Sequence, residues 1–143
     1  PKKFTNRRYL DALDERVLVF DGAMGTSLQE MHLTAEQFGG HTYNGCNDYL
    51  VISYPEAVEK IHRSFLEVGV DVLETDTFRS NRITMEEYGL QDRVIEIAVG
   101  QDRISGKMKT GENGEEILFT TVRVDTELSQ KLAAHHRHFT TVS

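Results

Sequence analysis

The sequence predicts an α/β fold, and three features of its first half point to this class. Residues 17–20 form an apolar run without alternation, which is typical of a strand buried on both faces. Residues 55–68 place apolar side chains at spacings of three and four, as an amphipathic helix does. Residues 70–74 form a second strand-like run. A strand, a helix and a strand in this order predict parallel strands joined by a right-handed crossover.

Local signals set the bounds of these elements and predict others. The helix at 55–68 begins with Pro55 at a favoured first-turn position, has Ser53 as a cap, and ends at Gly69. Ser80 is expected to cap a later helix that Gly89 closes. The further elements expected in the first two-thirds are a helix at 5–14, a helical turn at 27–31, a long loop at 34–45 and the helix at 80–88.

The last third has a different pattern. Alternating residues between Gly100, Gly106, Gly111 and Gly114 predict a β-meander of antiparallel strands, followed by a helix. We expect both parts to pack as one mixed-sheet domain. The expected elements are strands at 94–99, 103–109 and 117–124, a helix at 125–134 and a last strand at 138–142.

Composition excludes several classes of function. The chain has 143 residues and a formal charge of −7, with 23 acidic against 16 basic side chains, so it lacks the positive charge that nucleic acids or anionic membranes require. No apolar run approaches the roughly 20 residues of a membrane span. Cys46 is the single cysteine, which fits a reducing compartment. We expect a soluble, cytoplasmic protein.

The string "DGAMGT" places a carboxylate and bare backbone at the end of the first strand. Asp21 suits an ammonium group, and the amides of Ala23, Met24 and Gly25 suit a carboxylate, so the segment suits a zwitterion. The alternative is a tight turn with an Asx cap. The glycine spacing is that of neither a dinucleotide-binding loop nor a P-loop.

A second carboxylate, Glu74, ends the second strand in "LETDTF". Parallel strands place their carboxyl ends at one edge, so Asp21 and Glu74 are expected to face one pocket. The alternative is that Glu74 and Asp76 cap the next turn and helix. Asn47 and Asp48 are expected to hydrogen-bond the loop that follows Asp21 and hold it in place.

Metal ligands are scarce. Cys46 stands alone, whereas structural zinc requires four ligands and catalytic zinc three. The group His135, His136 and His138 lacks a metalloprotease spacing, and we read it as a solvated helix end, with metal binding left open.

Three ordered strings give the first two-thirds a family resemblance. They are "RVLVFDGAMGTSLQ", "GCNDYLVISYPEAVEKIHRSFLEVGVDVLETDTF" and "RSNRITMEEYGLQDRV". Over residues 8–97 the chain resembles the start of the homocysteine S-methyltransferase domain of cobalamin-dependent methionine synthases. The resemblance implies a fragment of a (βα)₈ barrel, with homocysteine-binding residues at Asp21, Gly22, Ala23, Met24, Gly25, Asn47, Asp48, Glu74 and Thr77.

In that family, zinc held by three cysteines from later strands binds the homocysteine thiolate, which attacks a methyl group on cobalamin. A complete barrel needs about 250 residues, and the three cysteines have no counterpart among these 143. We therefore expect neither zinc nor cobalamin in this chain.

Residues 94–142 resemble the extracytoplasmic domain of FtsH-type AAA+ proteases, through a strand, a "DRI-x-G" turn, "F-x-T-x-R-V" and a Leu-rich helix. This second resemblance predicts a hybrid, natural or engineered, with a methyltransferase-like part at 1–97 and a protease-like part at 98–143. The function expected is a vestigial homocysteine-binding half-site that is not catalytic alone. Open strand edges are covered by the strands of the last third in a mixed sheet or, alternatively, by a second copy of the chain in a homodimer. The alternative is a homocysteine S-methyltransferase.

Overall fold

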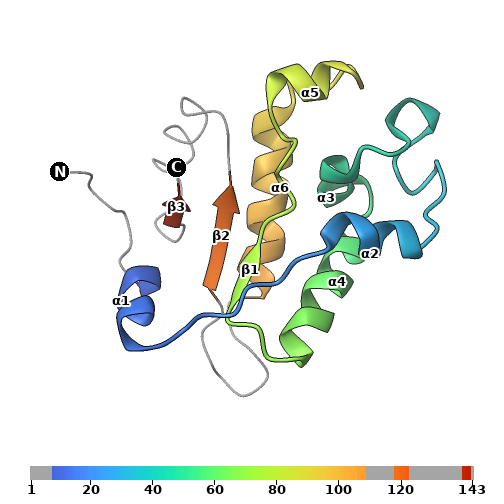
Figure 1. Cartoon of the computed structure of the whole chain (residues 1–143). Helices are drawn as coiled ribbons and strands as arrows, with labels where there is room; N and C mark the ends of the chain where they lie inside the picture. The colour runs from blue at the N-terminus through green and yellow to red at the C-terminus, as the bar shows by residue number, and fades with distance from the viewer. Residues whose placement is uncertain (1–7, 109–117, 123–139, 143) are drawn as a thin grey trace.

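The computed structural model describes residues 8–108, 118–122 and 140–142 (Figure 1). Within these ranges helices outweigh strands. The helices are α1 (Arg8–Glu15), α2 (Met24–Glu30), α3 (Leu50–Ser53), α4 (Pro55–Glu67), α5 (Arg82–Glu86) and α6 (Val94–Lys107), with 3₁₀ turns η1 (His41–Tyr43) and η2 (Asn47–Tyr49). The strands are β1 (Val72–Glu74), β2 (Leu118–Val122) and β3 (Thr140–Val142).

The described strands form one parallel sheet in the order β1-β2-β3. Val72 lies opposite Leu118, and Thr120 lies opposite Thr140. Figure 1 shows β2 between the other two strands, with α4 and α6 near β1. The sheet therefore has β1 as the strand closest to the helices.

Residues 17–20 run parallel to β1 on its other side. Phe20 forms a parallel bridge with Val72, and the carbonyl of Val19 accepts from the amides of Asp71 and Val72 at 2.8 and 3.1 Å. Leu18 is buried, but Val17 and Val19 are exposed. The expectation of a strand buried on both faces is therefore wrong, because β1 pairs with the edge of this segment while only the Leu18 side chain is buried.

The core lies where α3, α4 and α6 pack together behind β1. Leu50, Val58, Leu73 and Ile97 are fully buried there. Gly100 permits the close approach of α6 to α3, since a Cβ at this position would lie 2.9 Å from Val51 Cγ2. This packing fixes the end of β1 against the helices that surround the candidate site.

The strands expected at 94–99 and 103–109 are wrong, because Val94–Lys107 is one helix. Among its described residues, the buried side chains of Val94, Ile97, Ala98, Gln101 and Ile104 share one face of a helix of period 3.6. In the string "VIEIAV" the first four residues also fit the period of two that is typical of strands. This pattern led to the wrong prediction of a strand. The glycine at 100, taken for a turn, is a contact point between helices.

Within the strands expected at 117–124 and 138–142, the described residues form β2 and β3, but these pair in parallel and not as an antiparallel meander. A parallel pair requires a crossover connection, whereas a meander assumes short hairpins. The helix expected at 125–134 and the His135, His136 and His138 group lie outside the described residues. No helix in the described ranges is long and apolar enough to cross a membrane.

Candidate functional site

Asp21 and Glu74 lie side by side at the carboxyl ends of two parallel segments. The backbone N–H of Glu74 donates to Asp21 Oδ1 at 2.7 Å, and the Asp21 N–H donates to the Val72 carbonyl at 3.0 Å. Burial raises the pKa of the Glu74 carboxyl, and the charge of Asp21 raises it further. The structure thus brings together the two acids that the sequence placed at strand ends.

The second oxygen of Asp21 faces His62 on α4. The Asp21 Oδ2 and His62 Nδ1 atoms are 3.6 Å apart, with 3% and 0% of their side chains exposed. His62 Nε2 lies 3.3 Å from the Gln101 amide nitrogen. Which group donates in this contact depends on the tautomer of the His62 ring. The Asp21 carboxylate therefore accepts one backbone hydrogen bond and lies beside a buried histidine ring.

His62 was not recognised as a site residue from the sequence. It follows Ile61, which belongs to the apolar stripe of α4, and the sequence therefore suggested only a helical residue at this position. The signal available was a histidine on the buried face of a helix whose neighbouring strand ends in a carboxylate.

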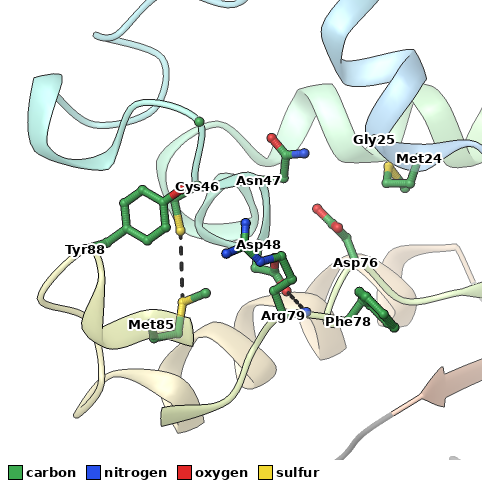
Figure 2. A pocket seen from close by; sticks show the side chains of 11 residues that line it. Met24, Gly25, Cys46, Asn47, Asp48, Asp76, Phe78, Arg79, Met85 and Tyr88 are labelled. Atoms are coloured by element: carbon green, nitrogen blue, oxygen red, sulfur yellow. Dashed lines mark hydrogen bonds between the residues drawn. The ribbon is translucent and has the colours of Figure 1, made fainter. Parts of the chain in front are cut away.

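A pocket of about 190 Å³ opens beside these strand ends (Figure 2). It lies between the start of α2, the turn η2 and the segment that follows β1. Its lining residues are Met24, Gly25, Gly45, Cys46, Asn47, Asp48, Asp76, Phe78, Arg79, Met85 and Tyr88. Four residues expected from the sequence line it: Met24, Gly25, Asn47 and Asp48.

The other expected residues lie outside this lining. Asp21 and Glu74 pair with one another, and Thr77 is buried with its hydroxyl 2.9 Å from the Thr75 hydroxyl. Gly22 has no neighbouring heavy atom within 4 Å of a Cβ position. Ala23 has a positive φ of 50° and precedes α2. These residues shape the segment around the pocket and do not form its wall.

Asp48 joins η2 to the segment after β1. Its Oδ1 atom accepts from the Arg79 N–H at 3.0 Å and from the Ser80 hydroxyl at 2.8 Å. Burial raises the pKa of Asp48, while these two hydrogen bonds act in the opposite direction. The expectation that Asp48 holds the loop after Asp21 is not what these contacts show. Asp48 instead binds residues 79 and 80. Ser80, which was expected to cap a helix, donates its hydroxyl to Asp48.

Asp76 lines the pocket, whereas its position in the sequence suggested only a capping role. The cap of α5 is Asn81, whose side chain accepts from the Thr84 N–H at 3.0 Å. Burial raises the pKa of Asp76 to about 7, and the nearby charge of Asp48 adds to the effect. Its Oδ2 atom is buried and has no hydrogen-bond partner among the described residues. The "ETDTF" string contained this residue but gave no sign that its carboxyl turns inward.

The side chains that the structure describes do not fit a zinc ion. Cys46 Sγ lies 4.0 Å from Met85 Sδ, and burial raises the pKa of this thiol to about 11. Across residues 8–108, 118–122 and 140–142, no three His, Cys, Asp or Glu side chains gather as a metal site. A buried, protonated thiol is a poor metal ligand, since zinc binds the thiolate.

Comparison with known proteins places most of this chain in one family. The family model described as "Homocysteine S-methyltransferase" matches residues 18–122. This match includes β2 and all of α6, so it crosses the boundary expected at residue 97. That boundary falls inside a continuous helix, which removes the strand–turn–strand basis of the protease-like reading over residues 94–109.

Two curated relatives agree with the family match. The methionine synthase of Mycobacterium tuberculosis (strain ATCC 25618 / H37Rv) is 43% identical over 89 residues, and that of Mycobacterium leprae (strain TN) is 40% identical over 89 residues. Each alignment covers 62% of this chain and 7% of the relative. The chain therefore spans only a small part of their length. Because the family model matches well over half of the residues, the chain belongs to the homocysteine S-methyltransferase family.

Proposed function

We propose that the described residues form the amino-acid-binding part of a homocysteine S-methyltransferase, and that the pocket receives the amino-acid end of homocysteine. The position of the pocket is the main support. It lies where two parallel segments end, between the residues that follow Phe20 and those that follow Glu74. Ligands of parallel α/β folds bind at this edge.

The chemistry of the pocket wall supports a small zwitterion. Met24 and Gly25 line one side of the pocket, and the exposed backbone at Gly25 suits the carboxylate of such a ligand. Asp48 and Asp76 provide negative charge on the other side, which suits an ammonium group. At about 190 Å³ the pocket is smaller than the cavities of roughly 300 Å³ or more that take drug-sized ligands. An amino acid matches this size.

For the fold, we propose that the segment 17–20 and β1 are the first strands of the family's (βα)₈ barrel. Their parallel pairing, with α4 as the crossover between them, supports this assignment. Every strand pair in the described ranges is parallel, as a barrel of this kind requires.

Isothermal titration with L-homocysteine tests the binding proposal. We expect binding by the wild-type chain and a loss of at least tenfold in Gly25→Leu, because the new side chain would extend toward Asn47, whose Nδ2 atom is 4.0 Å from the Cβ position. Gln29→Leu, on an exposed position of the same helix, is the matched control and should bind normally. Absence of binding by the wild-type chain, or normal binding by Gly25→Leu, would contradict the proposal.

The second candidate is methyl transfer itself, which the family membership favours. We place binding first because these 143 residues contain one cysteine, and that thiol is buried and protonated. An assay for methionine formation from homocysteine and methylcobalamin, with zinc present, separates the two. Turnover by the chain alone would favour the second candidate.

A further inference from the structure

The two acids of the pocket wall, Asp48 and Asp76, have different surroundings. Asp48 Oδ1 accepts from the Arg79 N–H at 3.0 Å and from the Ser80 hydroxyl at 2.8 Å, and both hydrogen bonds act against the effect of burial. Asp76 Oδ2 is buried and has no hydrogen-bond partner among the described residues. Burial and the charge of Asp48 raise the pKa of Asp76 to about 7, so Asp76 binds a proton far more readily than an ordinary aspartate does.

This property of Asp76 matches a specific task in methyl transfer to sulfur. A thiol must lose its proton before its sulfur attacks a methyl group, because the thiolate is the nucleophile. The side chains that serve best as general bases have pKa values near the working pH, since they are ionised and still hold a proton well. A carboxyl group with a pKa of about 7 meets both conditions near neutral pH.

The position of Asp76 allows contact with a small ligand. The residue lines the pocket, and Figure 2 shows its carboxylate directed towards the space beside Asn47 and Gly25. At about 190 Å³ the pocket is small, so a ligand of the size of homocysteine brings its thiol close to the wall. A general base must lie within about 3 Å of the group that it deprotonates, or reach it through one water molecule. The unpaired oxygen of Asp76 accepts such a proton without breaking a hydrogen bond within the described residues.

We propose that Asp76 is the general base that takes the proton from the thiol of a homocysteine bound in this pocket. The inference rests on the proposed function, because it assigns a residue to the reactive end of the same ligand. In this step the S–H bond breaks, an O–H bond forms on the Asp76 carboxyl, and the sulfur electron pair forms a bond to the carbon of an electrophilic donor. The leaving group of the donor departs with the electron pair of its own bond, and Asp76 then releases the proton to solvent.

The charged and titratable groups that face Asp76 set the pH range of this step. They are Asp48 from η2, Cys46 from the loop before η2 and Arg79 from the segment after β1. Cys46 is protonated throughout this range, because burial raises the pKa of its thiol to about 11. The step needs ionised Asp76, so its rate should rise with pH up to about 7 and then level off. The rate of a free thiol instead follows its own ionisation up to about pH 8.5.

Alkylation of L-homocysteine by iodoacetamide, with the wild-type chain in excess, tests the step with a simple electrophile. Calorimetry gives the affinity, and mass spectrometry measures the alkylated homocysteine separately from any alkylated Cys46. For the bound ligand we expect the rate to rise less than about twofold between pH 7.5 and pH 8.5. Free homocysteine should react about five times faster at the higher pH, because its thiolate fraction rises by that factor.

Asp76→Asn is the decisive variant, since it keeps the shape of the side chain and cannot take the proton. At pH 7 it should lower the rate of the bound ligand at least tenfold, and between pH 7.5 and pH 8.5 it should show the steep rise of a free thiol. Asp92→Asn, at an exposed position, is the matched control and should keep the wild-type rate and profile.

Two results would overturn the role of Asp76 alone. They are equal rates for the bound ligand in wild type and Asp76→Asn, and a wild-type rate that rises as steeply as that of free homocysteine. Failure of the wild-type chain to bind homocysteine in the calorimeter would overturn the proposed function as well.

Discussion

The backbone N–H of Glu74 donates to the Asp21 carboxylate at 2.7 Å, and this hydrogen bond joins the ends of two parallel segments. The same carboxylate faces the buried ring of His62. Asp21 therefore connects the segment 17–20 to β1 by a hydrogen bond and lies against α4. Its position at a strand end, which suggested a ligand contact, also serves the fold.

Replacing Asp21 should destabilise the chain. Asp21→Ala leaves the Glu74 N–H without its acceptor and removes the carboxylate beside the His62 ring, so we expect a loss of about 1–3 kcal/mol in the free energy of unfolding. Asp21→Asn retains one acceptor oxygen and should lose less. Urea unfolding followed by circular dichroism measures both, with exposed Asp14→Asn as the control. An Asp21→Ala variant as stable as the control would show that these contacts contribute nothing.

The buried carboxyl of Asp76 should make stability fall as pH rises. Its pKa is raised from 3.8 to about 7 in the folded chain, so the folded state binds more protons than the unfolded state between these values. Stability from this group is full below about pH 4 and is lost as pH approaches 7. Relative to Asp76→Asn, the wild-type chain should lose about 2–4 kcal/mol of unfolding free energy between pH 4 and pH 7.5.

Measuring both proteins at each pH cancels the titration of all other groups. If the difference in unfolding free energy between wild type and Asp76→Asn stays constant from pH 4 to pH 7.5, the carboxyl of Asp76 is solvated.

Cys46 should react slowly with thiol reagents. Burial raises the pKa of its thiol by about two units, to about 11, which lowers the thiolate fraction at pH 8 roughly 100-fold. Limited access beside Met85 slows the reaction further. Stopped-flow or manual kinetics with a disulfide reagent, compared in buffer and in denaturant, should show a native rate at least 100 times lower. Similar rates in both conditions would place the thiol at the surface.

Gly100→Ala should destabilise the chain although alanine is the better helix former. A Cβ at residue 100 would lie 2.9 Å from Val51 Cγ2 and 3.2 Å from the Val51 carbonyl oxygen, so α6 or α3 must move. We expect a net loss of about 1–3 kcal/mol, because overpacking outweighs the helix propensity gained. Gly22→Ala, where no heavy atom lies within 4 Å, should have little effect. A stabilised Gly100→Ala variant would contradict the α3–α6 contact.

Helix α4 and strand β1 could be predicted from the sequence because the local signals that bound them agree. Pro55 begins α4, Gly69 follows it, and β1 ends at Glu74 as expected. Residues 94–107 could not be predicted in the same way. Isoleucine and valine favour strands, and glycine favours turns, yet burial against α3 and α4 selected a helix.

The site was predicted in part for a similar reason. Strand ends can be located from apolar runs, which places Asp21 and Glu74 at one edge. The direction of the Asp76 side chain and the pairing of Asp48 with Ser80 depend on how the segment after β1 folds back on η2. No local pattern specifies that contact between residues 32 positions apart.

The most direct test of the homocysteine site is a titration of ¹⁵N-labelled protein with L-homocysteine, followed by amide chemical shifts. The account predicts saturable shifts centred on Met24, Gly25, Asn47 and Asp76, with the exposed end of α4 near Glu67 unchanged. Shifts that are absent at millimolar ligand, or that centre on residues away from the pocket, would contradict it.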